Sequence, residues 1–331
     1  MNSVPGADAY ADLFPTIAAD LAEVEARLRR VVHSRLPVVP EVYLHTVHAG
    51  GKRVRPALAL LAGRLAGEAC EATYDVAVVV ELIHLASLIH DDVVDDSSQR
   101  RARLTANRVW GNKNAVLVAD FTHAVAYRLL TRRCSVEVID RVTSVVIGMV
   151  EGELTQMYNE GSLDVAEQLY FEMIGHKTAG LMELAAELGA QVSGGAAWAL
   201  AALREYGRCI GLAFQVVDDL LDIAGDEARL GKPVGSDVRC GRLTLPLIRV
   251  LHAGAPDAAD ELRALVTRTT IDLDTVKAIR DVVERAGGLD HARETAERLA
   301  DQATAALAPF PDSEARRALT AFAGYIVARS Q

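Results

Sequence analysis

The chain has 331 residues, half of them apolar and only 5% aromatic, and its formal net charge is −10. This length permits one large domain or two ordinary ones, and the abundance of Ala, Leu and Val favours a helix-rich core. The acidic balance argues against non-specific nucleic-acid binding, which needs a basic surface.

The cysteines and the N-terminal residues bear on the cellular compartment. Four widely spaced cysteines, with no C-x-x-C pair, are typical of reduced thiols in a cytosolic protein. The N-terminal sequence MNSVPGADAY lacks the basic start and apolar run of a signal peptide. No stretch approaches about twenty uninterrupted apolar residues, so we expect no membrane span and a cytoplasmic location.

Apolar residues recur at helical spacing along most of the chain. The pattern predicts helices over 12–36, 57–66, 72–96, 114–134, 136–160, 171–192 and 197–224, with further helices from 244 onward. Pro37 and Pro40 break the pattern after the first helix. No alternating strand pattern stands out, and nothing suggests a separate second domain. The predicted fold class is therefore all-α, with residues 1–331 forming a single domain.

A basic segment precedes the second predicted helix. Residues 50–56 read Gly-Gly-Lys-Arg-Val-Arg-Pro. A flexible backbone, helix-terminal N–H groups and guanidinium groups can converge on one phosphate. A solvated basic turn would have the same composition, so this segment alone leaves both interpretations open.

The helix predicted over 72–96 ends in four carboxylates: Asp91, Asp92, Asp95 and Asp96. Asp91 and Asp95 stand four residues apart and so share one helix face. Clustered acids repel one another, and hard oxygen ligands suit Mg²⁺, which shares itself with substrate phosphates. His84 lies two turns before Asp91 on the same face, where it is either a satisfied core histidine or part of a site.

Three arginines follow directly, at positions 100, 101 and 103. They could simply neutralise the acids on a surface. Alternatively, Mg²⁺ and arginine could hold one polyphosphate from two sides.

A second acid set closes the helix predicted over 197–224. Asp218 and Asp219 are followed one turn on by Asp222, which repeats the spacing of the first set. Basic residues again follow, at Lys232, Arg239 and Arg242. One such cluster could be accidental, but two that each end a helix indicate a functional site.

The motifs GGKRVRP, LIHDDVVDDSSQRR, KTAGL, FQVVDDLLD and GKPVGSDVRCGRLTLP occur in this order between residues 43 and 249. In that order they resemble the trans-isoprenyl diphosphate synthases, or polyprenyl synthetases. The resemblance implies an all-helical single domain around a deep central cavity, usually in a homodimer. It implies head-to-tail condensation of isopentenyl diphosphate with an allylic diphosphate (geranyl, farnesyl or geranylgeranyl). It also implies three Mg²⁺ ions shared between the acid sets and the allylic diphosphate.

The resemblance also implies roles for individual residues. The two acid sets would bind Mg²⁺, through Asp91, Asp92, Asp95, Asp218, Asp219 and Asp222. Binding of isopentenyl diphosphate falls to Lys52, Arg55, His84 and Arg101. Contact with the allylic diphosphate falls to Arg100, Lys177 and Lys232. Thr178 and Gln215 would lie near the reacting carbon. Together with Lys177 and Lys232 they form the expected catalytic group.

The chemistry of the reaction agrees with these roles. Breaking an allylic C–O bond produces a carbocation and a diphosphate, and cations stabilise the charge on the leaving oxygens. A neutral hydroxyl or amide oxygen can face the carbocation without trapping it. The cavity beyond the diphosphates should be apolar and dry, and the released diphosphate can accept the final proton.

The residues before the first acid set predict product length. In the family, bulky aromatics at this point stop a growing chain early, whereas Ala86 and Ser87 are small. We therefore expect a product beyond fifteen carbons, of medium or long chain, with geranylgeranyl diphosphate as the alternative. Phe171, Met157 or a residue of a partner subunit could form the cavity floor. No membrane span is expected, although a long product can partition into a membrane.

Three rival functions share part of this pattern. A class I terpene cyclase also ionises allylic diphosphates at an acid-rich helix end, but such cyclases lack the GGKRVRP-type site and the second acid set. A non-catalytic subunit of a hetero-oligomeric synthase would be expected to have lost acids or lysines that this chain keeps. A structural cation-binding protein does not explain two acid sets with matched basic loops.

Overall fold

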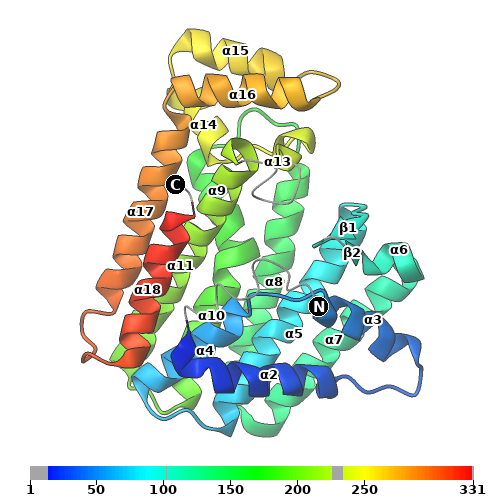
Figure 1. Ribbon diagram of the computed structural model, residues 1–331, viewed down its shortest axis with the longest axis vertical. Helices are drawn as coiled ribbons and strands as arrows, with labels where there is room; N and C mark the ends of the chain where they lie inside the picture. The colour runs from blue at the N-terminus through cyan, green and yellow to red at the C-terminus, as the bar shows by residue number, and fades with distance from the viewer. Residues whose placement is uncertain (1–13, 102, 226–233, 330–331) are drawn as a thin grey trace. The chain divides into compact units, whose positions relative to one another are not determined.

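The computed structural model describes residues 14–101, 103–225 and 234–329, and nearly all their regular structure is helical (Figure 1). The prediction of an all-α fold class is confirmed. The chain divides into two compact units. Unit 1 contains Met1–Val146, Leu181–Arg204 and Pro309–Leu319, and unit 2 contains Ile147–Gly180, Glu205–Ala308 and Thr320–Gln331.

Unit 1 contains the long helix α5 (Glu71–Val94) and several shorter elements. In chain order its elements are η1 (Pro15–Ile17), α2 (Ala18–Val31), α3 (Val38–His48), α4 (Val54–Ala66), α5 (Glu71–Val94), β1 (Gln99–Arg100), β2 (Arg103–Leu104), α6 (Ala106–Trp110), α7 (Asn112–Arg133) and α10 (Gly180–Val192). Helix α5 packs along α7 and α4, and α2 lies crosswise against α5 (Figure 1).

The elements of unit 2 include a π-helical turn. They are α9 (Glu167–Ile174), the turn η2 (Gly175–Ala179), α13 (Ser236–Arg239), α14 (Leu245–Ala253), α15 (Pro256–Val266), α16 (Leu273–Arg285) and α17 (Gly288–Ala306). Four helices contribute residues to both units. They are α10, of which Gly180 lies in unit 2, and α8 (Val136–Tyr158), α11 (Ala197–Ala224) and α18 (Glu314–Ala328).

Helix α5 forms the core of unit 1. Between Val76 and Ile89 every residue is buried except His84, Ser87 and Leu88. By length and composition alone α5 could cross a membrane, but 67% of its most apolar 18-residue window is buried inside the protein. Burial in the core therefore accounts for its hydropathy.

Several elements differ from the sequence-based expectation, among them α3 and the hairpin β1–β2. Residues 38–48 form helix α3 although Pro37 and Pro40 were expected to break the pattern. Pro37 is the N-cap residue and Pro40 lies in the first turn, where no backbone N–H is needed. The antiparallel hairpin β1–β2 was not predicted either, because two-residue strands are too short to show alternation.

Helix α4, which follows the basic segment, packs very closely against α10. A Cβ atom placed on Gly189 of α10 would lie only 2.1 Å from the carbonyl oxygen of Ala59 in α4. Only glycine permits this approach, because no flexible atom at the contact can move aside.

We expect Gly189→Ala to destabilise the protein by at least about 2 kcal/mol, because the added methyl group must push two packed backbones apart. The matched control is Gly324→Ala in α18, where a Cβ atom would meet nothing within 4 Å. That variant should be neutral or stabilise by about 0.5–1 kcal/mol. Urea unfolding of both variants measures the difference, and equal stabilities would contradict the close-packing account.

Candidate active site

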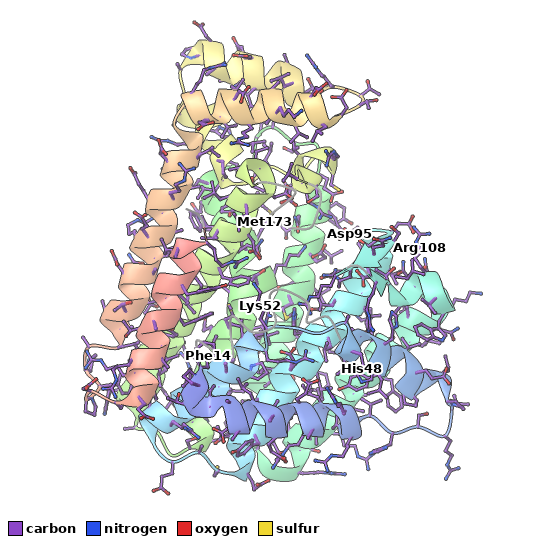
Figure 2. The ribbon with its side chains drawn as sticks, viewed as in Figure 1. Phe14, His48, Lys52, Asp95, Arg108 and Met173 are labelled. Carbon is purple, nitrogen blue, oxygen red and sulfur yellow. The ribbon has the colours of Figure 1, made fainter. Side chains whose placement is uncertain are left out.

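The first acid set lies where α5 leaves the core of unit 1. Asp91 and Asp92 occupy the last turn, and Asp95 is the C-cap residue (Figure 2). Asp92 is buried, whereas Asp91 is half-buried and Asp95 is exposed. The C-terminal end of a helix carries partial negative charge, so acids placed there need cations nearby.

Asp92 receives its cation from the hairpin that follows the helix. Arg100 Nε donates to Asp92 Oδ1 at 2.9 Å. Burial raises the pKa of Asp92, and the neighbouring guanidinium of Arg100 opposes that rise. Asn107 Nδ2 also donates to the backbone oxygen of Asp92 at 3.0 Å, which fixes the hairpin region against the helix end. Asp92 and Arg100 thus form an ion pair. The resemblance implied a different ligand for each of them, Mg²⁺ for Asp92 and the allylic diphosphate for Arg100.

A cluster of basic side chains forms near His84 in unit 1. Burial lowers the pKa of His84 well below its usual value, and the positive charges of Arg55 and Arg101 lower it further. The pKa of Arg101 is also lowered, first by burial and then by neighbouring arginines. A Cβ atom on Gly51 would lie 3.1 Å from Arg101 Nη1, so the glycine segment approaches this arginine closely. Cations held this close to one another would be stabilised by an anion bound between them.

Lys52 precedes α4 at the surface (Figure 2), and the adjacent Arg53 holds the segment in place. Arg53 adopts a left-handed conformation, with φ 47°. Its guanidinium donates to Glu25 at 2.8 Å and to Glu81 at 2.7 Å. Sequence reasoning gave Arg53 and Glu25 no role, because their partners lie on other helices.

Lys177 and Thr178 lie on the π-helical turn η2 of unit 2. A Cβ atom on Gly152 of α8 would lie 3.1 Å from the backbone nitrogen of Lys177, so α8 passes close to this turn. Lys177 Nζ contacts Glu153 Oε2 at 2.5 Å and Gln156 Oε1 at 2.6 Å. Glu153 and Gln156 of α8 therefore hold the lysine.

Each acid of the second set has a different partner within unit 2. Asp222 is buried and accepts from Ser236 Oγ at 2.6 Å and from the backbone N–H of Asp237 at 3.0 Å. Asp218 is half-buried and accepts from Arg329 Nη2 at 2.9 Å. The guanidinium of Arg329 also lies 5.2 Å from the centroid of the Phe214 ring. A residue near the C-terminus thus neutralises one acid of the second set.

Asp219 is buried and accepts two hydrogen bonds. Tyr170 Oη and Gln215 Nε2 each donate to it at 2.7 Å. Burial and the nearby charge of Asp237 raise the pKa of Asp219 well above its usual value, while the two donors oppose that rise. Burial together with the charge of Asp219 raises the pKa of Tyr170, so its hydroxyl keeps its proton.

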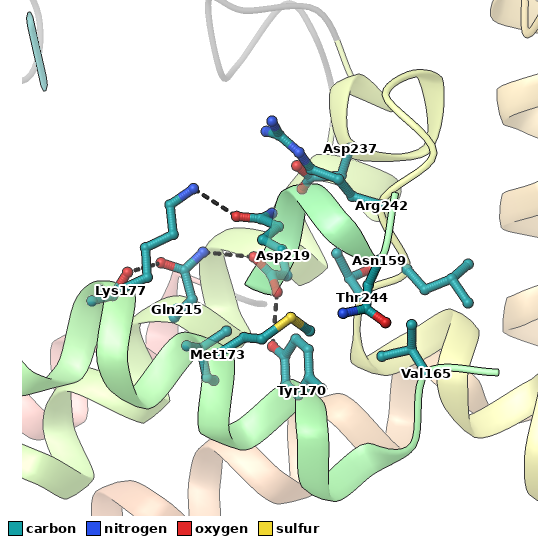
Figure 3. A pocket seen from close by; sticks show the side chains of 14 residues that line it. Asn159, Val165, Tyr170, Met173, Lys177, Gln215, Asp219, Asp237, Arg242 and Thr244 are labelled. Atoms are coloured by element: carbon teal, nitrogen blue, oxygen red, sulfur yellow. Dashed lines mark hydrogen bonds between the residues drawn. The ribbon is translucent and has the colours of Figure 1, made fainter. Parts of the chain in front are cut away.

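These residues line a pocket of about 120 Å³ within unit 2 (Figure 3). Its polar wall includes Lys177, Thr178, Gln215 and Asp219, and its apolar wall includes Val165, Met173, Ile174 and Leu243. Thr178 Oγ1 donates to Gln215 Oε1 at 2.8 Å. The structure therefore brings together four residues that the sequence placed in two separate motifs, KTAGL and FQVVDDLLD.

Lys232, the remaining basic residue implied by the resemblance, lies outside the described residues. Sequence reasoning also gave no role to Tyr170 or Arg329. Tyr170 lies seven residues before Lys177, but an aromatic residue in a helix is ordinary. Arg329 lies 111 residues from its partner, so no local pattern could connect them.

The donor chemistry of both acid sets fits a hard divalent cation. Within residues 14–101, 103–225 and 234–329, no three His, Cys, Asp or Glu side chains form a ready metal site. The accessible acids of the first set offer only carboxylate oxygens, which suit Mg²⁺. Such an ion would take its other ligands from water and from a diphosphate.

Known proteins match this chain over nearly its whole length. It is 37% identical over 314 residues to the octaprenyl diphosphate synthase of Escherichia coli (strain K12), covering 95% of this chain and 97% of that protein. A crystal structure of a decaprenyl diphosphate synthase from Rhodobacter capsulatus superposes with a TM-score of 0.90 at 36% identity, covering 97% of this chain and 99% of that one.

A polyprenyl synthase from Caulobacter crescentus, crystallised with calcium and isoprenyl diphosphate, superposes with a TM-score of 0.91 at 35% identity, and 98% of each chain is covered. The family model described as polyprenyl synthetase matches residues 37–283. The chain therefore belongs to the polyprenyl synthetase family.

Proposed function

We propose that this protein is a Mg²⁺-dependent prenyltransferase that condenses isopentenyl diphosphate head-to-tail with an allylic diphosphate. The product is an all-trans polyprenyl diphosphate longer than fifteen carbons, of medium or long chain. The observation that carries the proposal is that a polyprenyl synthetase chain keeps both acid sets at helix ends, each with its own basic partners. The related octaprenyl and decaprenyl synthases favour this length over geranylgeranyl diphosphate.

In the proposed mechanism, Arg55, His84 and Arg101 bind isopentenyl diphosphate with Lys52. Neutral His84 can donate a hydrogen bond to a phosphate oxygen without adding a charge. Three Mg²⁺ ions held by the acid sets would neutralise charge on the allylic diphosphate. The calcium and isoprenyl diphosphate in the Caulobacter crescentus structure support a divalent ion at such a site.

On the allylic side, Lys177, Arg100 and Lys232 would contact the diphosphate. Lys177 already lies between Glu153 and Gln156, so a diphosphate must compete with one carboxylate for it. Thr178 and Gln215 would face the developing carbocation with neutral oxygens. The apolar wall of the pocket would exclude water, which would otherwise quench the cation.

We also propose that residues 1–331 form one domain, in the cytoplasm. Four of the boundaries between the two units fall inside helices, namely α8, α10, α11 and α18, and one falls between α17 and α18. The proposal of a cytoplasmic location is supported by the wide spacing of the four cysteines, which is typical of reduced thiols.

The purified protein should convert isopentenyl and farnesyl diphosphates to longer polyprenyl diphosphates only when Mg²⁺ is present. Asp91→Asn should lower kcat/KM by at least about a hundredfold, because stabilisation of the leaving diphosphate is lost. Asp281→Asn, on an exposed face of α16, is the control and should leave the rate unchanged. Radiolabel incorporation measures the rates. Turnover without a divalent ion, or no turnover by the chain alone, would contradict the proposal, and the second result would favour a hetero-oligomeric subunit.

Ser87→Phe should shorten the product. The partly accessible stripe of α5 runs through His84, Ser87, Leu88 and Asp91, so a phenyl group at position 87 would obstruct the path behind the acids. Ala86, by contrast, is fully buried, and we expect Phe there to disturb the core rather than to block a chain. Ser87→Ala is the control, and chromatography of dephosphorylated products gives the lengths. Equal lengths for Ser87→Phe and Ser87→Ala would refute the steric account.

A homodimer is also proposed, formed through α8. Five large apolar side chains of this helix, Ile147, Val150, Leu154, Met157 and Tyr158, follow helical spacing and are 44–86% exposed. A stripe of this kind usually marks a protein–protein contact.

Val150→Glu combined with Leu154→Glu should convert the dimer to a monomer, because two buried carboxylates without partners would oppose association. The control is Leu273→Glu, at an exposed leucine that begins α16. Light scattering during gel filtration gives the mass. A double variant that stays dimeric would show that α8 is not the interface.

A further inference from the structure

Four side chains in the pocket of Figure 3 form one continuous hydrogen-bond chain. It runs from Tyr170 on α9 to Asp219 and Gln215 on α11, and then to Thr178 on η2. The three links measure 2.7, 2.7 and 2.8 Å. Tyr170, Asp219 and Thr178 are all buried, so water cannot easily replace a lost partner.

The atoms of Gln215 give the chain its direction. The amide Nε2 of Gln215 donates to Asp219 Oδ1, so the amide oxygen points away from Asp219. The amide oxygen then faces Thr178 and accepts its hydroxyl proton. The oxygen lone pairs of Thr178 consequently remain for the pocket, where the proposed carbocation forms.

Close backbone packing fixes the last link. A Cβ atom on Gly211, one turn before Gln215, would lie 2.6 Å from the Cα atom of Ala179, the residue after Thr178. Helix α11 and the π-helical turn therefore touch directly beside the Gln215–Thr178 bond.

We propose that Tyr170 and Asp219 are positioning residues that hold the Gln215 amide in one orientation, so that Thr178 presents its oxygen to the allylic carbocation. This inference rests on the proposed function and deepens it. It gives Asp219 a positioning role beside the metal binding that the resemblance implied, since each carboxylate oxygen accepts one short hydrogen bond within the pocket.

The test begins with Tyr170→Phe, which removes one donor to Asp219 and keeps the ring. We expect the single-turnover rate to fall about tenfold, as for loss of a hydrogen bond to a charged group. The KM values for both diphosphates and the Mg²⁺ concentration for half-maximal rate should change less than about twofold. The matched control is Tyr74→Phe, which removes a 2.6 Å bond to Asp20 in unit 1 and should leave the rate unchanged.

A double-mutant cycle separates positioning from other roles. In a Gln215→Leu background, Tyr170→Phe should have less than about a twofold effect, because its path to Thr178 is already broken. Enzyme in excess over radiolabelled substrate keeps slow variants measurable. Gly211→Ala, which pushes Thr178 from Gln215, should likewise lower the rate with little change in KM.

Three results would overturn the inference. One is an unchanged rate for Tyr170→Phe, and another is multiplicative effects in the double variant. The third is a several-fold higher Mg²⁺ requirement for Tyr170→Phe, which would show that Tyr170 acts through metal binding rather than through Gln215 and Thr178. A wild-type protein without prenyl-transfer activity would instead refute the proposed function itself.

Discussion

The accumulation of negative charge at two helix ends is the constraint on which the rest of the site depends. Both acid sets stand at the C-terminal ends of helices, where the helix dipole adds to their repulsion. The protein balances part of this charge itself, with Arg100 on Asp92 and Arg329 on Asp218. Asp91 and Asp95 remain accessible, and an anionic diphosphate could approach them only together with a divalent cation.

The basic cluster of unit 1 instead carries an excess of positive charge. Glu25 and Glu81 neutralise Arg53, yet burial, and after it neighbouring positive charge, lowers the pKa values of both His84 and Arg101. A diphosphate bound there would relieve this repulsion without any metal. Under the proposed function, one substrate would bind through cationic side chains and the other through metal.

Local features of the sequence predicted much of this architecture. The helix over 197–224 was predicted at its observed bounds, because its apolar period is strong. The acid sets were found because their spacing lies within a single helix. Contacts between distant segments could not be found in this way, as the partners of Tyr170 and Arg329 show. The π-helical turn at 175–179 also escaped prediction, since one widened turn leaves a helical period almost unchanged.

Calorimetric binding of a non-reactive farnesyl thiolodiphosphate, with and without Mg²⁺, tests the central claim most directly. We expect the allylic analogue to bind only with the ion and to lose affinity in Asp91→Asn. Isopentenyl diphosphate should bind with similar affinity in both conditions. Tight binding of the analogue in the absence of any divalent cation would contradict the account that metal ions bring the diphosphate to these acids.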